Sequence, residues 1–133
     1  SVIQELEEAE RLTAKNTGMT LTMAVNYGGR QEILDAAQSL VDKAAASKKS
    51  FQVTKSRFEK ELYLPKMADV DLFIRSSGEL RTSNFLLWQA SYAEYCFMDE
   101  LWPDFTRETL WRAISEYSAR KRRFGGAVDS PLN

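Results

Sequence analysis

The segment at residues 70–88, VDLFIRSSGELRTSNFLLW, contains side chains that are well suited to binding an anion. Arg75 and Arg81 lie six positions apart in a polar stretch that also contains several hydroxyl groups and a glycine. A guanidinium group donates paired hydrogen bonds to phosphate oxygens, and a helix starting at Ser83 or Asn84 would add free backbone N–H groups. The segment therefore predicts a phosphate or diphosphate site.

A second interpretation of the same stretch needs no ligand. Glu79 lies between the two arginines and is placed to form an ion pair with Arg75 or Arg81. The segment would then be a solvated surface loop, in which such a pair contributes little. The residue types alone leave both interpretations open.

The hydrophobic pattern predicts an α/β fold that would position this segment. Helices are expected over residues 2–15, 33–46, 51–62 and 84–92, and a last helix capped by Asp104 is expected to turn Leu110, Trp111, Ile114 and Tyr117 inward. Strands are expected over residues 19–25, 70–74 and 95–98. Alternating strands and helices favour a parallel sheet flanked by helices, which binds ligands at its carboxyl edge. Since three strands make a small sheet, the fold is expected to be incomplete.

Composition restricts the classes of protein to which the chain can belong. Its 133 residues are 44% hydrophobic with three tryptophans, as expected for one globular domain rather than a disordered segment. The net charge of −1 gives no general attraction to nucleic acid or to an anionic membrane. Cys96 is the single cysteine and histidine is absent, which excludes an internal disulfide and a Cys/His zinc site and favours a reducing, intracellular compartment.

Three blocks of the sequence match known motifs. They are DLFIRSSGELRTSNFLLWQASYAEYCFMDELWPDF at residues 71–105, NYGGR at residues 26–30 and RRFGG at residues 122–126. In this order they resemble motifs of the cis-prenyltransferases, the Z-type isoprenyl diphosphate synthases that include undecaprenyl diphosphate synthase. The resemblance implies a transferase that condenses isopentenyl diphosphate onto an allylic diphosphate to give a Z-polyprenyl diphosphate.

The resemblance also assigns substrate-binding residues. In the family, the two arginines and the serine of the R-x-x-G-E-x-R-x-S pattern bind the diphosphate of isopentenyl diphosphate, and Arg75, Arg81 and Ser83 match them. The family's terminal R-x-G motif reaches across a dimer interface to the isopentenyl diphosphate of the other subunit, and Arg123 and Gly125 match it. A homodimer is therefore expected. The alternative for this basic run is a solvated helix end.

A metal role and several supporting roles follow in the same way. Glu94 matches the family carboxylate that helps to hold Mg²⁺, a hard cation that prefers oxygen ligands. The alternative is a structural carboxylate paired with an arginine at the start of a strand. We expect Glu79 to orient the neighbouring arginines rather than to bind metal. Asn26, Gly28 and Gly29 are expected to shape the edge of the sheet near the substrate, although a Gly-Gly turn is usually only a turn.

The family's N-terminal block, H-x-x-D-G-N-x-R-W, has no counterpart in this sequence. That block supplies the aspartate at the centre of catalysis and the loop for the allylic diphosphate, so we expect no catalytic residue here. Residues 1–133 are expected to be the C-terminal part of a single cis-prenyltransferase domain, inactive alone. The expected location is intracellular, in the cytoplasm or a plastid. The chain starts without Met in a helical pattern, so we expect it to be part of a longer protein, in which any targeting segment would lie outside these residues.

Two other functions stay open from the sequence. Some eukaryotic cis-prenyltransferases contain a noncatalytic partner subunit that contributes the R-x-G tail, although such partners generally lose the R-x-x-G-E block. A nucleic-acid-binding module is disfavoured by the overall charge and by the lack of an aromatic-rich basic face. We expect no nucleic-acid partner and no transmembrane segment, and any peripheral membrane contact would come through a lipid product.

Overall fold

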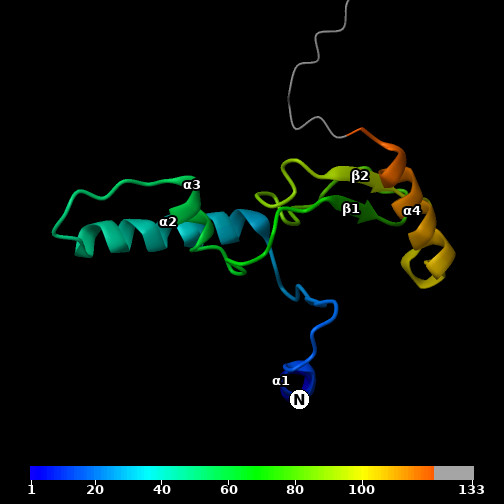
Figure 1. Cartoon of the computed structure of the whole chain (residues 1–133), viewed down its shortest axis with the longest axis horizontal. Helices are drawn as coiled ribbons and strands as arrows, with labels where there is room; N and C mark the ends of the chain where they lie inside the picture. The colour runs from blue at the N-terminus through cyan, green and yellow to red at the C-terminus, as the bar shows by residue number, and fades with distance from the viewer. Residues whose placement is uncertain (122–133) are drawn as a thin grey trace, which may run out of the picture.

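The computed structural model describes residues 1–121 as a short parallel sheet accompanied by helices (Figure 1). The helices are α1 (Val2–Thr13), α2 (Gly29–Ala46), α3 (Lys55–Glu59) and α4 (Arg107–Ala119), and the strands are β1 (Leu72–Arg75) and β2 (Glu94–Phe97). A single 3-10 turn at Trp102–Asp104 precedes α4. The expected fold class, an incomplete parallel sheet flanked by helices, is confirmed.

The two strands have a register that fixes which residues share an end of the sheet. Leu72 lies opposite Glu94, and Arg75 lies opposite Phe97. Because the strands are parallel, the first pair closes the amino end of the sheet and the second pair closes its carboxyl end. Two strands form in the described residues, where the sequence pattern predicts three.

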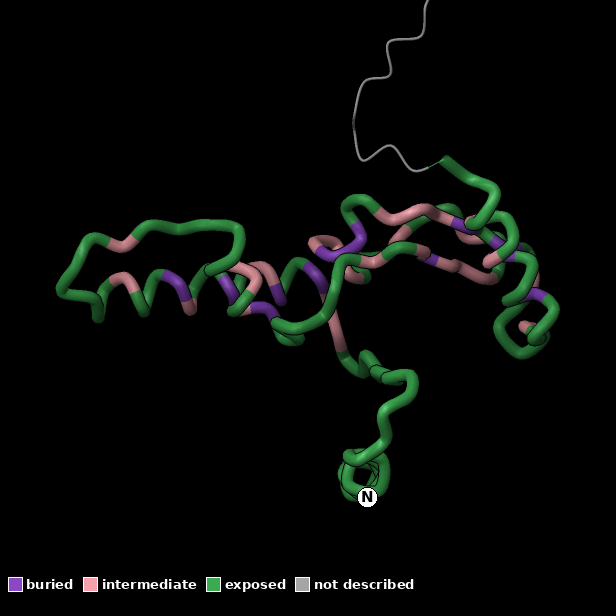
Figure 2. Tube along the Cα trace, in the orientation of Figure 1, coloured by how far each residue is buried: buried purple, intermediate pink, exposed green. Residues whose placement is uncertain are grey.

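The first packed region lies between the sheet and α4, which contacts both strands (Figures 1 and 2). Ala113 of α4 is fully buried against Cys96 and Met98. Partly buried apolar residues surround this cluster: Leu72, Ile74 and Phe105. The small side chain of Ala113 allows the helix backbone to approach the sheet closely, so α4 is fixed relative to the ends of the strands.

The second packed region lies along α2. Ala36 and Leu40 of α2 are buried, and α3 packs against the same helix. The ring centroids of Phe58 and Trp88 lie 4.5 Å apart, and the Trp88 indole N–H donates to Glu59 at 3.3 Å. These contacts attach the segment after β1 to α3, which in turn packs against α2.

Residues 19–25 do not form the expected strand. The segment has no regular secondary structure, and its backbone forms no hydrogen bond with any described residue. Its alternate apolar side chains are largely exposed: Met19 94%, Leu21 78%, Met23 65% and Val25 72%. The prediction is wrong because a strand requires a neighbour for its backbone groups, and no described segment supplies one.

Residues 84–92 do not form the expected helix. Ser83, Asn84 and Leu86 have φ values of 49°, 65° and 48°, which a right-handed helix does not permit. Isolated turns form in place of a helix, with Ala90 N donating to Leu86 O at 2.8 Å and Ser91 N donating to Trp88 O at 3.4 Å. The left-handed residues instead turn the Asn84 carbonyl toward Gly29, whose N–H donates to it at 2.7 Å.

The last helix starts two residues later than expected. Thr106, rather than Asp104, is its N-cap, and the Thr106 hydroxyl accepts from Thr109 N at 3.3 Å. Thr109 and Ala113 are the buried residues of the helix, while Trp111 is 58% exposed and Leu110 is 39% exposed. The expected inward face was wrong for Leu110 and Trp111, whereas Ile114 and Tyr117 are half-buried. Small residues, not large ones, allow this helix to lie close to the sheet.

The ends of the other helices follow their capping residues. α3 is shorter than expected and begins after Thr54, which accepts from Arg57 N. α1 is exposed along its whole length and contacts no other described helix or strand. No helix in residues 1–121 has both the length and the apolar character that crossing a membrane would require.

Candidate functional site

An open groove of about 910 Å³ lies at the carboxyl end of the sheet. One wall is the loop after β1, with Arg75, Ser76, Ser77 and Glu79. The other wall is the start of α4 and the turn before it, with Trp102, Phe105 and Arg107. The groove thus combines guanidinium and hydroxyl donors with an apolar face.

Arg75 is the last residue of β1 and is partly buried in this groove. Its carbonyl accepts from Met98 N at 2.8 Å, which holds the backbone to the chain after β2. Ser77 and Gly78 follow with φ values of 70° and 66°, a left-handed turn for which glycine is well suited. The Arg75 guanidinium has no hydrogen bond or ion pair with residues 1–121, so its donors are available to an anion.

The remaining residues of the predicted diphosphate site are not all gathered in the groove. Glu79 forms an ion pair with Arg81, whose side chain is 64% exposed. Ser83 is exposed, and neither Arg81 nor Ser83 lines the groove. The structure therefore brings Arg75 and Glu79 together in the lining of the groove. Arg81 lies next to them through its ion pair with Glu79, which both the diphosphate-site and the surface-loop interpretations of the sequence predict.

Glu94 lies at the opposite, amino end of the sheet. Its N–H donates to Asp71 O at 2.9 Å, and its carboxylate accepts from Arg120 Nη1 at 3.1 Å. The same Arg120 nitrogen donates to Tyr95 O at 2.7 Å. The register separates Glu94 from the level of Arg75 by three residues along parallel strands, or about 10 Å.

The described residues do not form a metal site by themselves. Residues 1–121 contain no group of three or more His, Cys, Asp or Glu side chains placed to hold a metal ion. Glu94 is engaged by Arg120 and belongs to no such group. A cation at Glu94 would need ligands from elsewhere.

The glycine pair Gly28–Gly29 packs against the segment that follows the arginine loop. A Cβ on Gly28 would lie 2.9 Å from the Asn84 side chain, and one on Gly29 would lie 3.0 Å from Leu87 Cγ. Asn84 also caps α2, because its carbonyl accepts from Gly29 N and its side-chain oxygen accepts from Arg30 N at 2.9 Å. The glycines thus permit a close approach that links α2 to the loop of the candidate site.

Asn26, the other predicted supporting residue, precedes this contact. It has a φ of 53°, a left-handed conformation that asparagine tolerates better than most residues. Its supporting role, like the other predicted site roles, stays a prediction. Arg123 and Gly125 lie outside the described residues.

Sequence reasoning missed a buried carboxylate in the first turn of α2. Glu32 is 2% exposed and accepts from Tyr27 OH at 2.5 Å, Tyr63 N at 3.1 Å and Gln89 Nε2 at 3.1 Å. Burial, and then the hydrogen bond to Glu32, raise the pKa of Tyr27. Glu32 precedes the buried Ala36 by four residues, and this spacing places it on the buried face of the helix.

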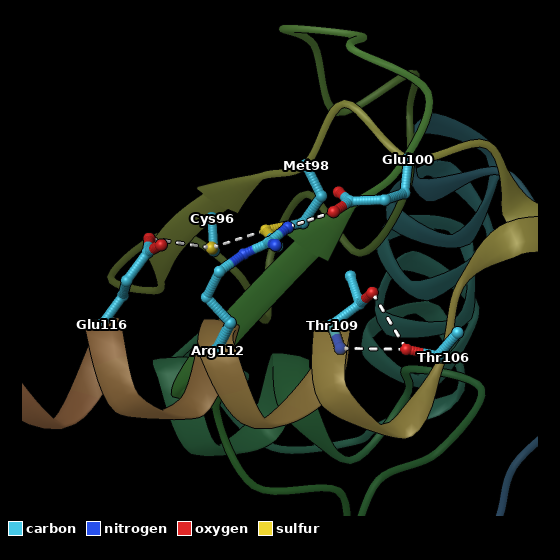
Figure 3. A network of polar contacts seen from close by, with 7 residues as sticks. All are labelled: Cys96, Met98, Glu100, Thr106, Thr109, Arg112 and Glu116. Atoms are coloured by element: carbon cyan, nitrogen blue, oxygen red, sulfur yellow. Dashed lines mark hydrogen bonds and ion pairs between the residues drawn. The ribbon is translucent and has the colours of Figure 1, made fainter.

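The residues that hold α4 were also missed. Arg112 forms an ion pair with Glu100, and the Cys96 thiol lies 3.4 Å from a Glu116 carboxylate oxygen (Figure 3). Glu100 holds the pKa of Arg112 above its ordinary value, while burial and then Glu116 raise that of Cys96. These contacts fix the helix that carries Arg107 into the groove.

Comparison with known proteins identifies the family. Residues 1–125 match the family model described as "Putative undecaprenyl diphosphate synthase". A trans,polycis-polyprenyl diphosphate synthase ((2Z,6E)-farnesyl diphosphate specific) of Thermobifida fusca is 56% identical over 99% of this chain and 47% of its own length. A decaprenyl diphosphate synthase of Mycolicibacterium smegmatis is 52% identical over 96% of this chain and 44% of its own length.

Solved structures of similar fold agree with this result. The lavandulyl diphosphate synthase of Lavandula x intermedia, solved with dimethylallyl diphosphate, has a TM-score of 0.82 and 36% identity, covering 92% of this chain and 53% of that one. A probable undecaprenyl diphosphate synthase of Campylobacter jejuni has a TM-score of 0.77 and 35% identity, covering 93% of this chain and 56% of that one. The chain thus spans about half the length of the relatives it matches, and it belongs to the undecaprenyl diphosphate synthase family of cis-prenyltransferases.

Proposed function

We propose that this chain supplies the isopentenyl diphosphate site of an enzyme that elongates Z-polyprenyl diphosphates. The proposal is supported by family membership and by the names of the relatives, which are polyprenyl and decaprenyl diphosphate synthases. The observation that carries it is the unpaired Arg75 guanidinium in the groove at the carboxyl end of the sheet. Ligands of open α/β sheets bind at this edge.

In the proposed reaction, the C–O bond of the allylic diphosphate breaks, a C–C bond forms with the double bond of isopentenyl diphosphate, and a proton is lost. The diphosphate of the isopentenyl substrate does not leave. Arg75 would therefore bind and orient this group through charge-assisted hydrogen bonds, while the ion pair with Glu79 would hold Arg81 close to it. Ser83 would contact the same diphosphate after a movement of its loop.

We also propose that residues 1–133 are the C-terminal part of a single domain. Residues 19–25 support this proposal, because their alternate apolar side chains are exposed. Such a segment is normally covered by a neighbouring strand and an apolar layer, and residues outside this chain would supply both. The coverage of the structural neighbours, just over half of each chain, supports it as well.

Mg²⁺ as cofactor and a homodimer are parts of the same proposal. Glu94 would contribute one carboxylate to the cation, and the bound diphosphates and residues outside this chain would provide the other ligands. Arg123 and Gly125 would contribute to the isopentenyl diphosphate site of a second copy. Light scattering of the full chain tests the dimer, for which the expected mass is twice the 15.2 kDa of one chain.

The proposed function is tested by incorporation of labelled isopentenyl diphosphate with Mg²⁺ and a short allylic primer. The chain alone is expected to give no product, whereas the chain mixed with the N-terminal part of a relative is expected to give product. Turnover by the chain alone would contradict the proposed division of the domain. A mixture that folds and stays inactive would contradict the proposed function.

The metal role of Glu94 has a separate test. Isopentenyl diphosphate binding is measured calorimetrically at increasing Mg²⁺ for the wild type, Glu94→Gln and Glu79→Gln in the mixture. Glu94→Gln alone is expected to raise the Mg²⁺ concentration needed. Equal Mg²⁺ dependence in all three would show that Glu94 is a structural partner of Arg120.

A further inference from the structure

We propose that Arg107, at the start of α4, is a second diphosphate-binding arginine in the groove of Arg75. The inference rests on the proposed function and extends it, because Arg107 lies beyond the block at residues 71–105 that resembles the family signature. It is carried by the placement of two cations from different elements in one groove. Arg75 comes from the end of β1, and Arg107 is the first residue of α4.

Neither guanidinium is neutralised within the described chain. Arg75 forms no ion pair with residues 1–121, and the single carboxylate near Arg107 is that of the adjacent Glu108, 3.9 Å from Nε. The Arg107 and Glu108 side chains are 80% and 77% exposed, so this contact contributes little. Arg107 can therefore turn toward an anion without breaking a strong interaction.

The groove has an excess of positive charge. Its one carboxylate, Glu79, is already paired with Arg81. Among the residues that line the groove, Arg75 and Arg107 are thus left without a carboxylate partner. A multiply charged anion that bridges both walls would satisfy both guanidinium groups, and a diphosphate has oxygens on two phosphorus atoms with which to do so.

Glu100 connects the two walls of the groove. Its backbone carbonyl accepts from Ser77 N at 2.7 Å on the Arg75 side, and its carboxylate pairs with Arg112 of α4 on the Arg107 side (Figure 3). The buried Ala113 holds the same helix against the sheet. Because these contacts fix the spacing of the walls before a ligand arrives, little ordering is needed for an anion to contact both.

The test is calorimetric titration of the full chain with inorganic diphosphate. Arg107→Gln is expected to weaken binding about three- to tenfold and to reduce its dependence on salt, and Arg107→Lys is expected to restore much of the affinity. Arg11→Gln, which removes the same charge from α1, is the matched control and should bind like the wild type. The thermal unfolding of each variant checks the fold.

The outcomes separate this inference from the proposed function. If Arg75→Gln weakens binding and Arg107→Gln binds like the wild type, the inference is wrong and the proposed function stands. If neither the wild type nor any variant binds diphosphate, both are wrong. If Arg11→Gln weakens binding as much as Arg107→Gln, the effect reports overall charge, and the inference is wrong.

Discussion

The two ends of the β1–β2 sheet carry charged side chains in opposite situations. At the carboxyl end, Arg75 projects into a groove and has no counter-ion in residues 1–121. At the amino end, Glu94 is held by Arg120, which also binds the carbonyl of Tyr95. A charge that is paired within the chain must share or exchange its partner before it binds a ligand, whereas an unpaired charge in a groove is available directly.

One sequence motif contributes residues to both ends of the sheet. Arg75 and Glu94 belong to the block of sequence that resembles the family signature, yet the parallel register puts them at opposite ends of the sheet. Closeness in the sequence motif is therefore not closeness in this structure.

Replacing Arg75 should have the largest effect on ligand binding. Arg75→Gln is expected to weaken the binding of isopentenyl diphosphate roughly ten- to hundredfold, because a hydrogen bond to a charged group is worth about 1.5–3 kcal/mol. Arg120→Gln, at the amino end, is the control and should bind normally in metal-free buffer. Calorimetric titration measures the affinity of both variants. Equal losses of affinity would show that the two ends of the sheet do not differ in ligand binding.

Moving α4 away from the sheet should disturb the carboxyl end through the fold. Ala113 is fully buried between α4 and the strands, so Ala113→Leu is expected to lower the free energy of unfolding by about 1–3 kcal/mol. Ala119→Leu places the same side chain at an exposed position of α4 and should change stability little. Chemical denaturation of both variants checks the prediction, and equal stability would mean that α4 does not pack as described.

The tie between the groove walls should depend on pH. Arg112 holds the pKa of Glu100 below its ordinary value of 4.5, so the ion pair stabilises the folded state above that pH. This contribution is lost as the pH falls from 4.5 through the lower pKa of the folded state. Glu100→Gln should therefore be less stable than the wild type at pH 7 and lose less stability on acidification. Parallel loss of stability in both proteins would contradict the account.

The ion pair at the amino end should contribute least to stability. The side chains of Arg120 and Glu94 are 37% and 28% exposed, so Glu94→Gln is expected to cost about 0.2–1 kcal/mol of folding free energy. Denaturation at low and high salt measures this difference, which salt should reduce. A loss of several kcal/mol would show that Glu94 has a larger structural role.

The sequence was sufficient for the features that depend on local pattern. Periodic apolar residues located α1, α2 and α4, and the strand-forming run before Arg75 located β1, which starts two residues later and ends one residue later than expected. The position of the arginine-containing loop at a strand end also followed from pattern. These features depend on residues that are close together in the sequence, so the sequence pattern alone is sufficient to predict them.

Other features depend on contacts distant in the sequence and could not be read from it. Residues 19–25 have a strand pattern, but no described segment forms backbone hydrogen bonds with them. Asn84 was expected to start its own helix and instead caps α2, 54 residues away at the Arg30 amide. Arg107 had no pattern to mark it, since only the packing of α4 brings it to the groove.

The most direct test of the central claim is to locate a bound diphosphate on the molecule by NMR. Titration of the ¹⁵N-labelled chain with inorganic diphosphate is expected to shift the backbone amides of residues 75–79 and 106–110, at the carboxyl end of the sheet. Shifts concentrated instead around Asp71, Glu94 and Tyr95 would place the anion at the amino end. That result would contradict the assignment of the carboxyl-end groove as the diphosphate site.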